Sequence, residues 1–274
     1  MSLTVILTHE YTDFDALASL LGAHLIFPHA VPVLPRQLNR NVREFAHLFK
    51  GALPFIEPDD LPKHQHVDEA ILVDTRSVNW PRGMDDATRI LVIDHHQDMG
   101  RDEREAVEVE VSEEPGAPDV WADRDPAETP AAWRFWTDDV GANTTMLVER
   151  IRERGLRLTS SQATLLALGI YEDTGSLTYR STTPRDVTCV AWLLDAERGA
   201  NLEVLARFLR HPLSEEQRKV YQTLMDNSEH LTIDGNRVVV ATASALGFRD
   251  EISTLAHKLR NLYEPDAQIG RAHV

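Results

Sequence analysis

Residues 3–21 read LTVILTHEYTDFDALASLL and carry two structural signals in succession. The apolar run that ends at Thr8 predicts a buried strand, and the leucines after Asp15 recur at helical spacing. His9, Asp13 and Asp15 stand between the two signals, and their side chains can bind a metal ion. The stretch therefore predicts a strand, a turn that carries metal ligands, and a helix that Asp15 caps.

Two later stretches repeat the pattern of an apolar strand followed by ligand residues. These are residues 70–73 followed by Asp74, and residues 90–93 followed by Asp94, His95 and His96. In an open parallel sheet the carboxyl ends of the strands lie along one edge, where ligands bind in the crevice above them. Side chains that are far apart in the sequence are therefore predicted to meet in one pocket.

The predicted pocket holds imidazoles and carboxylates but no thiolate. This donor set suits Mn²⁺, with Mg²⁺ and Co²⁺ as alternatives, better than a soft metal. Clustered carboxylates need cations to balance them, and a single ion would leave much of the charge unbalanced. Two ions about 3.5–4 Å apart that share a carboxylate form the arrangement used in phosphoryl displacement. Asp74, which stands alone at the end of its strand, is the expected bridge.

Composition narrows the class of protein. The chain has 274 residues and a formal net charge of −16, from 28 Lys and Arg against 44 Asp and Glu. This balance excludes a broad basic face that tracks long nucleic acid, so a short phosphorylated substrate fits better. The single cysteine, Cys189, excludes an internal disulfide and lies in an apolar helical run, where a buried structural thiol is expected. No apolar run reaches the about 18–20 residues of a membrane helix, so we expect a soluble cytoplasmic protein.

Strands and helices alternate along most of the chain, which predicts an α/β fold. We expect a doubly wound, mostly parallel sheet followed by the beginning of a smaller α/β domain. The expected divisions are a first domain over 1–210, a linker helix over 211–228 and an incomplete substrate-binding domain over 229–267. Within that last domain a strand is predicted over 237–242 and a helix over 251–262. Residues 268–274 lack periodicity and match the translation of a sequencing adapter, which predicts a non-native tail.

Two smaller features belong to the first domain. A short strand is expected over residues 33–34, and residues 103–130 form an acidic, loop-like excursion. Trp133, Phe135 and Trp136, which follow it, could stack on a base or anchor the excursion on the core, and the second role is commoner.

Four segments of the chain resemble the signature motifs of one enzyme family. They are His9-Glu-Tyr-Thr-Asp13-Phe-Asp15-Ala-Leu-Ala-Ser19, Asp74-Thr75, Asp94-His95-His96 and Asp173-Thr-Gly175. In this order and strand context they resemble the DHH-family phosphoesterases. That family includes RecJ-type exonucleases, nano-RNases, cyclic-dinucleotide phosphodiesterases and manganese-dependent inorganic pyrophosphatases.

The resemblance implies a role for each ligand residue. One metal ion would be bound by His9, Asp13 and Asp74, and the second by Asp15, Asp74, His95 and Asp173. The implied catalytic set is His96, which would face the scissile phosphate, together with Asp74 and Asp94, the latter orienting an imidazole.

Two further places could contact substrate. Asn143 and Thr144 precede a helix within residues 141–145, where main-chain N–H groups could cradle an anion, although ordinary capping is an equal alternative. Arg180 follows Asp173 closely and could meet a phosphate.

The function implied by the resemblance is that of a two-metal-dependent phosphoesterase. It would hydrolyse phosphodiester bonds of short oligonucleotides or of linear or cyclic dinucleotides, with a metal-activated water. The alternatives are a manganese-dependent inorganic pyrophosphatase and a non-catalytic nucleotide-sensing module.

The opening motif is especially similar to that of bacterial fusion proteins. In these proteins the domain is joined to CBS pairs and a tRNA nucleotidyltransferase or poly(A) polymerase module. We therefore expect such C-terminal modules, and a homodimer, as partners. Many oligonucleotide-cleaving relatives also have a glycine-rich C-terminal segment that grips substrate, and this segment is absent here. Thr12 and Ala16 replace a proline and a glycine of relatives without loss of a ligand.

Overall fold

The structure is a computed structural model. It describes residues 2–62, 65–78, 81–95, 107–108, 133–195, 199–209, 213–233, 235–244, 252–263 and 267–273. The chain divides into two compact units, Met1–Leu209 and Arg210–Val274, and each is described by itself.

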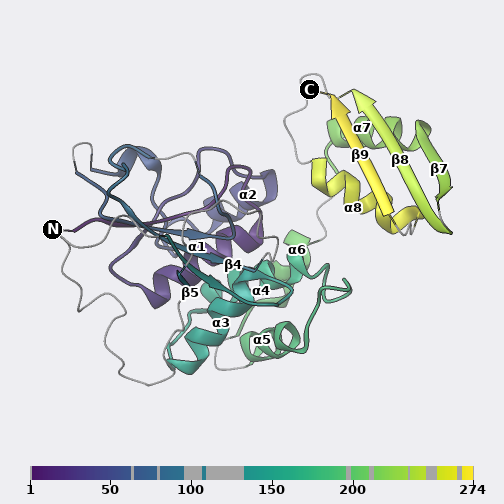
Figure 1. Ribbon diagram of the computed structural model, residues 1–274. Helices are drawn as coiled ribbons and strands as arrows, with labels where there is room; N and C mark the ends of the chain where they lie inside the picture. Colours follow the sequence, from purple (N-terminus) through teal and green to yellow (C-terminus); the bar gives the residue numbers. More distant parts are fainter. Residues whose placement is uncertain are drawn as a thin grey trace. The chain divides into compact units, whose positions relative to one another are not determined.

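The first unit is built on a six-stranded sheet with the order β2-β1-β3-β4-β6-β5. Figure 1 labels β4 and β5 of this sheet. Its strands are β1 (Thr4–Leu7), β2 (Val31–Pro32), β3 (Glu69–Val73), β4 (Arg89–Asp94), β5 (Val107–Glu108) and β6 (Trp133–Thr137). Every pair of neighbouring strands is parallel. The predicted α/β class with a parallel sheet is therefore confirmed.

The helices of this unit pack mainly on one face of the sheet. They are α1 (Phe14–Ile26), α2 (Arg40–Leu48), α3 (Asn143–Glu153), α4 (Ser160–Asp173), α5 (Pro184–Leu194) and α6 (Leu202–Leu209), with a 3₁₀ turn η1 at Pro58–Asp60. Their apolar side chains form one core with Ile6, Ile71 and Ile93 of the sheet. The other face forms a second core with partly buried residues of connecting segments, such as Ile56 and Met84.

The packing of α1, α3 and α4 depends on a glycine. A Cβ atom at Gly169 would lie 2.6 Å from Thr144 Oγ1 and 2.8 Å from Ala18 Cβ. The three helices can therefore approach closely only where α4 has no side chain. This close approach brings the first turn of α3 against α1, where Thr144 contacts Asp15.

The strand order creates a topological switch point between β1 and β3. After β1 the chain moves to β2 on one side, and it then returns to β3 on the other side of β1. Crevices at the carboxyl ends of the strands on either side of such a point are the usual ligand sites of open α/β sheets. His9 and Asp74, which follow β1 and β3, lie at this position.

The sequence prediction missed β6. Trp133, Phe135 and Trp136 belong to this strand, which pairs with β4, and not to a loop. Trp133 and Phe135 pack on one core and Trp136 on the other, as alternation along a strand requires. The adjacent aromatic residues concealed that alternation. The strand predicted at residues 33–34 lies two residues earlier in the sequence, at Val31–Pro32.

The second unit has a three-stranded sheet with two helices. The elements are α7 (Glu215–Asp226), β7 (Ser228–Ile233), β8 (Asn236–Ser244), α8 (Ile252–Tyr263) and β9 (Ala267–His273). β7 and β8 are antiparallel, whereas β8 and β9 are parallel. β7 was not predicted, and residues 268–273, predicted to lack periodicity, form most of β9. The origin of residues 268–274 stays a prediction.

Among the residues that the structure describes, no helix combines the length and apolar character required to cross a bilayer.

Candidate metal centre

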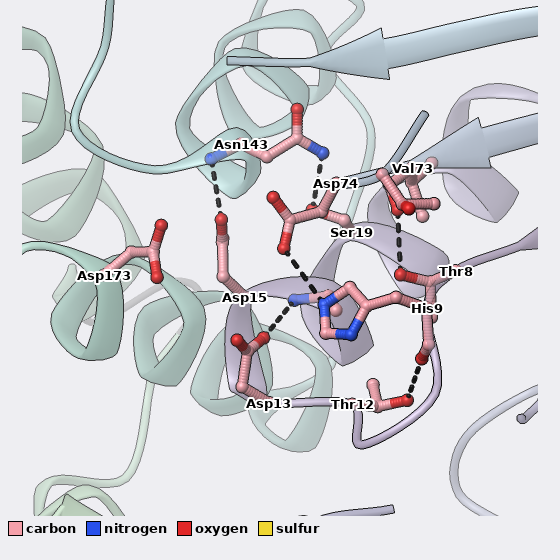
Figure 2. Close-up of polar contacts among 12 residues, drawn as sticks. Thr8, His9, Thr12, Asp13, Asp15, Ser19, Val73, Asp74, Asn143 and Asp173 are labelled. Carbon is pink, nitrogen blue, oxygen red and sulfur yellow. Dashed lines mark hydrogen bonds and ion pairs between the residues drawn. The ribbon is translucent and has the colours of Figure 1, made fainter. Parts of the chain in front are cut away.

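The turn after β1 is held by side-chain hydrogen bonds to the end of β3 and within the turn itself. Thr8 Oγ1 donates to the Val73 carbonyl at 2.8 Å and so ties the end of β1 to the end of β3. Thr12 Oγ1 donates to the His9 carbonyl at 2.8 Å and closes the turn. His9 Nδ1 lies 2.9 Å from the Glu10 carbonyl, which leaves Nε2 facing Asp74 (Figure 2).

Asp13, and not Asp15, caps helix α1. Its carboxylate accepts from the Ala16 N–H at 2.9 Å, in the extended conformation typical of an N-cap. The sequence contains two aspartates in suitable positions, and local pattern could not distinguish them. The residue predicted as the cap is therefore available for a different contact.

Asp15 binds the N-terminus of helix α3. Its two carboxylate oxygens accept from the main-chain N–H groups of Asn143, at 2.8 Å, and Thr144, at 3.0 Å. The first turn of α3 is thus an anion cradle, as one reading of the sequence proposed, but the anion is a side chain of the protein itself. Both Asn143 and Thr144 are fully buried, so the predicted substrate contact is not supported there.

Asp74 occupies an unusual backbone conformation at the end of β3. Its φ of 54° lies in the left-handed region, which residues with a Cβ rarely adopt. The side chain lies between two histidines: Oδ2 is 3.7 Å from His9 Nε2, and Oδ1 is 3.7 Å from His95 Nε2. The two oxygens of one carboxylate therefore face opposite ligand groups.

His95 is oriented from both sides. Its Nδ1 lies 3.1 Å from the Val140 carbonyl, and its Nε2 lies 3.2 Å from Asp173 Oδ2, at the last residue of α4. A metal-binding histidine typically donates its second N–H to a carbonyl or carboxylate in this way. The Val140 contact therefore fixes the tautomer that presents Nε2 to Asp173.

These side chains form two groups, each able to hold an ion. His9, Asp13 and Asp74 form what we call the loop cluster, and Asp15, His95 and Asp173 form the helix cluster. Within each cluster one ligand atom per residue lies within 4.8 Å of the others. Figure 2 shows members of both clusters around Asp74.

The clustered charges shift the ionisation of their members. Burial, followed by the neighbouring Asp173 carboxylate, raises the pKa of Asp15 to about 6. Burial and the surrounding aspartates raise the pKa of Asp74 well above its usual value. For His95, burial lowers the pKa, but the hydrogen bond with Asp173 and the carboxylates of Asp15 and Asp74 outweigh it and raise the pKa to about 10.

The residues present fit divalent cations. Carboxylate oxygens and imidazole nitrogens, without thiolate, are ligands for ions such as Mn²⁺ or Mg²⁺. Burial is the main cause of the raised pKa values of Asp15 and Asp74, and repulsion between the neighbouring carboxylates adds to it; bound cations would offset that repulsion.

Sequence reasoning missed Arg76. Its Nε donates to Asp94 Oδ2 at 2.8 Å, and Asp94 is 2% exposed. This ion pair joins the ends of β3 and β4, which carry Asp74 and His95. The sequence feature that could have indicated this ion pair was a basic residue two positions after Asp74. Of the other predicted residues, Arg180 is exposed, and His96 lies outside the described residues.

The structure is that of an α/β protein whose parallel sheet carries two clusters of aspartate and histidine side chains at its switch point. The family model described as "DHH family, N-terminal domain" matches residues 4–170. The chain therefore belongs to the DHH family, as its motifs indicated.

Curated relatives and solved structures agree with this assignment. The chain is 31% identical over 270 residues to an A-adding tRNA nucleotidyltransferase of Geobacter sulfurreducens, which covers 96% of this chain and 27% of the relative. It is 32% identical over 265 residues to the enzyme of the same name from Aquifex aeolicus, covering 96% and 28%. The chain thus spans little more than a quarter of the length of these relatives.

Two solved structures share the fold. An exopolyphosphatase-related protein from Bacteroides fragilis has a TM-score of 0.58 at 15% identity, over 91% of this chain and 68% of that one. A candidate family II inorganic pyrophosphatase from Methanococcus jannaschii has a TM-score of 0.50 at 17% identity, over 96% and 77%.

Proposed function

We propose that this chain is a phosphoesterase module that binds two divalent cations, with Mn²⁺ the preferred ion, and hydrolyses phosphodiester bonds of short oligonucleotides or dinucleotides. The observation that carries the proposal is the placement of Asp74, a member of the loop cluster, between His9 of the same cluster and His95 of the helix cluster. Its two oxygens lie equally far, 3.7 Å, from His9 Nε2 and His95 Nε2. A carboxylate in this position is suited to bridge two ions.

The ligand residues would be divided between the two ions. His9 and Asp13 would hold one ion, and Asp15, His95 and Asp173 the other, with Asp74 shared. The bound ions would polarise a phosphate and lower the pKa of an attacking water. The Val140 carbonyl and the N-terminus of α3 keep the ligands in place, because they hold His95 and Asp15 from behind. His96, next in the sequence, is proposed to contact the scissile phosphate.

The substrate class follows from charge and from the relatives. A chain with a net charge of −16 offers little electrostatic attraction for long nucleic acid, so a short substrate held by metal ions fits better. The curated relatives carry names that specify addition of A to tRNA. We propose that this chain acts within a similar longer protein, where nucleotidyltransferase modules follow it.

The relatives' names also favour a second candidate. Transfer of a nucleotide from ATP to RNA releases inorganic diphosphate, and a metal-dependent module in the same protein could hydrolyse it. This candidate is a pyrophosphatase, and it needs the same clusters. A nucleotide-sensing module without turnover is the third alternative.

One assay separates these candidates. The purified chain is incubated with Mn²⁺ and, in separate reactions, a di- or triribonucleotide, a cyclic dinucleotide, or inorganic diphosphate. The proposal expects mononucleotide release from a phosphodiester substrate. Release of phosphate from diphosphate alone would establish the second candidate, and metal uptake without turnover of any substrate would favour the sensing module.

A further inference from the structure

Asn143 is a buried polar residue whose contacts reach both clusters. It is the first residue of α3 and is fully buried. Its main-chain N–H donates to Asp15 Oδ2 at 2.8 Å, and its side-chain amide lies 2.9 Å from Ser19 Oγ (Figure 2). A buried amide needs partners for both its oxygen and its nitrogen.

Rotating this amide by half a turn from the orientation in Figure 2 satisfies both of its ends. The amide nitrogen then donates to the Ile93 carbonyl at 3.2 Å. The amide oxygen accepts from the Asp74 main-chain N–H at 3.2 Å and from Ser19 Oγ at 2.9 Å. The assignment of oxygen and nitrogen follows from these partners, as is usual for an asparagine.

Through this hydrogen bond the Asn143 amide contacts Asp74, which is the one proposed ligand with a strained backbone. Asp74 has a φ of 54°, and such a conformation persists only where surrounding contacts hold it. Its N–H also donates to the Ile93 carbonyl at 2.9 Å, so Asn143 joins an existing contact between β3 and β4. The side chain of Asn143 thus holds the backbone of a loop-cluster ligand, while its main chain holds a helix-cluster ligand.

We propose that Asn143 is a positioning residue that fixes the spacing between the loop cluster and the helix cluster. The proposal rests on the proposed function, since it concerns clusters that bind two ions. Asn143 is fully buried and acts through its contacts with Asp74 and Asp15. Contacts that orient metal ligands in this way typically contribute about 10- to 100-fold to metal affinity.

The test compares Asn143→Ala with Thr164→Ala in the full chain. Thr164 is a matched control because it is 1% exposed and its Oγ1 joins the Ser160 carbonyl, at 2.6 Å, to the Asn201 N–H, at 2.8 Å, away from the ligands. Titration calorimetry with Mn²⁺ gives the number and affinity of bound ions, and electron paramagnetic resonance reports the magnetic coupling between two Mn²⁺ ions. Thermal unfolding without metal measures the structural cost of each change.

Asn143→Ala is expected to weaken Mn²⁺ binding at both clusters by about 10- to 100-fold and to reduce the coupling signal. Thr164→Ala should lower the unfolding temperature but leave both metal readouts unchanged. Equal Mn²⁺ affinity in folded Asn143→Ala and the unmodified chain would overturn the proposal.

A gentler variant covers the case in which Asn143→Ala does not fold. Ser19→Ala removes one hydrogen bond to the Asn143 amide and retains the amide itself. A decrease in Mn²⁺ affinity supports the proposal, and unchanged affinity overturns it. Failure of the unmodified chain to bind Mn²⁺ would instead refute the proposed function, so the two failures are distinguishable.

Discussion

Asp74 belongs to the loop cluster and also faces His95 of the helix cluster, but the two clusters are held by different kinds of contact. In the loop cluster, Thr12 bonds to His9 and Asp13 to Ala16, each over three residues of sequence. In the helix cluster, His95 contacts Val140 over 45 residues, and Asp15 contacts Asn143 over 128. One half of the metal centre is therefore organised by a local turn, and the other half by packing between distant elements.

This difference suggests how each half responds to change. The locally closed turn keeps His9 and Asp13 together whenever β1 and α1 form, and only Asp74 has to be added from β3. The helix cluster requires that α3, α4 and β4 all be in place. The loop cluster should therefore tolerate substitutions elsewhere in the unit, whereas the helix cluster should be sensitive to them.

The largest effect is expected where the two clusters meet. Asp74→Ala removes the carboxylate that faces both, so metal-dependent activity should fall by at least about 10²- to 10³-fold, the size associated with loss of one preorganised electrostatic group. Activity assays measure the loss of turnover, and Mn²⁺ calorimetry measures the loss of metal binding. Asp68→Ala is the control, because Asp68 precedes the same strand and bonds to the Leu3 N–H at the other end. Full turnover by Asp74→Ala would refute the bridging role.

Single substitutions in each cluster should separate the two ions. Asp13→Asn and Asp15→Asn should each reduce the number of bound Mn²⁺ ions from two to one. Asparagine is as good an N-cap as aspartate, so Asp13→Asn should retain stability. Asp15→Asn places an amide opposite the N–H groups of α3 and should cost about 1–3 kcal/mol in unfolding free energy. Equal unfolding free energies of the two variants in denaturant titrations would contradict the proposed difference in how the two clusters are held.

Metal affinity should rise with pH. Asp15 has its pKa raised to about 6 and His95 to about 10, so in the metal-free protein Asp15 retains a proton below about pH 6 and His95 retains one below about pH 10, and an ion must displace these protons. Lower proton concentration favours that displacement, and the affinity should increase by about tenfold per pH unit for each proton released. Mn²⁺ calorimetry between about pH 5 and pH 8, in buffers of different ionisation enthalpy, measures both quantities. An affinity independent of pH would contradict the raised pKa values.

The smallest effect concerns the contact between β3 and β4. Arg76→Ala removes a donor from Asp94, which is 2% exposed, and should lower the unfolding free energy by about 1–3 kcal/mol. Partial exposure of Arg76 favours the lower part of this range. Arg36→Ala is the control, since the Arg36–Asp59 pair is largely exposed and its loss should leave the denaturation midpoint unchanged. A larger loss of helix-cluster than loop-cluster ion binding in Arg76→Ala would support the proposed sensitivity.

Much of the first unit could be predicted because its signals are short in range. The strands before Asp74 and Asp94 and the helix over residues 160–172 follow from apolar periodicity. Residue type indicated the candidate ligands after the strands, whereas Asp173 was implied by the family resemblance. β6 could not be predicted in this way, because consecutive aromatic residues gave no alternation and its place is fixed by pairing with β4.

The sequence by itself determined which side chains could bind metal ions and that parallel strands would carry them to one edge. The tertiary structure decided which aspartate caps α1, which one α3 holds, and which cation pairs with Asp94. The physical reason is that a turn or a cap is selected by a few neighbouring residues, whereas a buried carboxylate finds its donors only after distant helices have packed. Asp13 and Asp15, two residues apart, are held by partners three and 128 residues away.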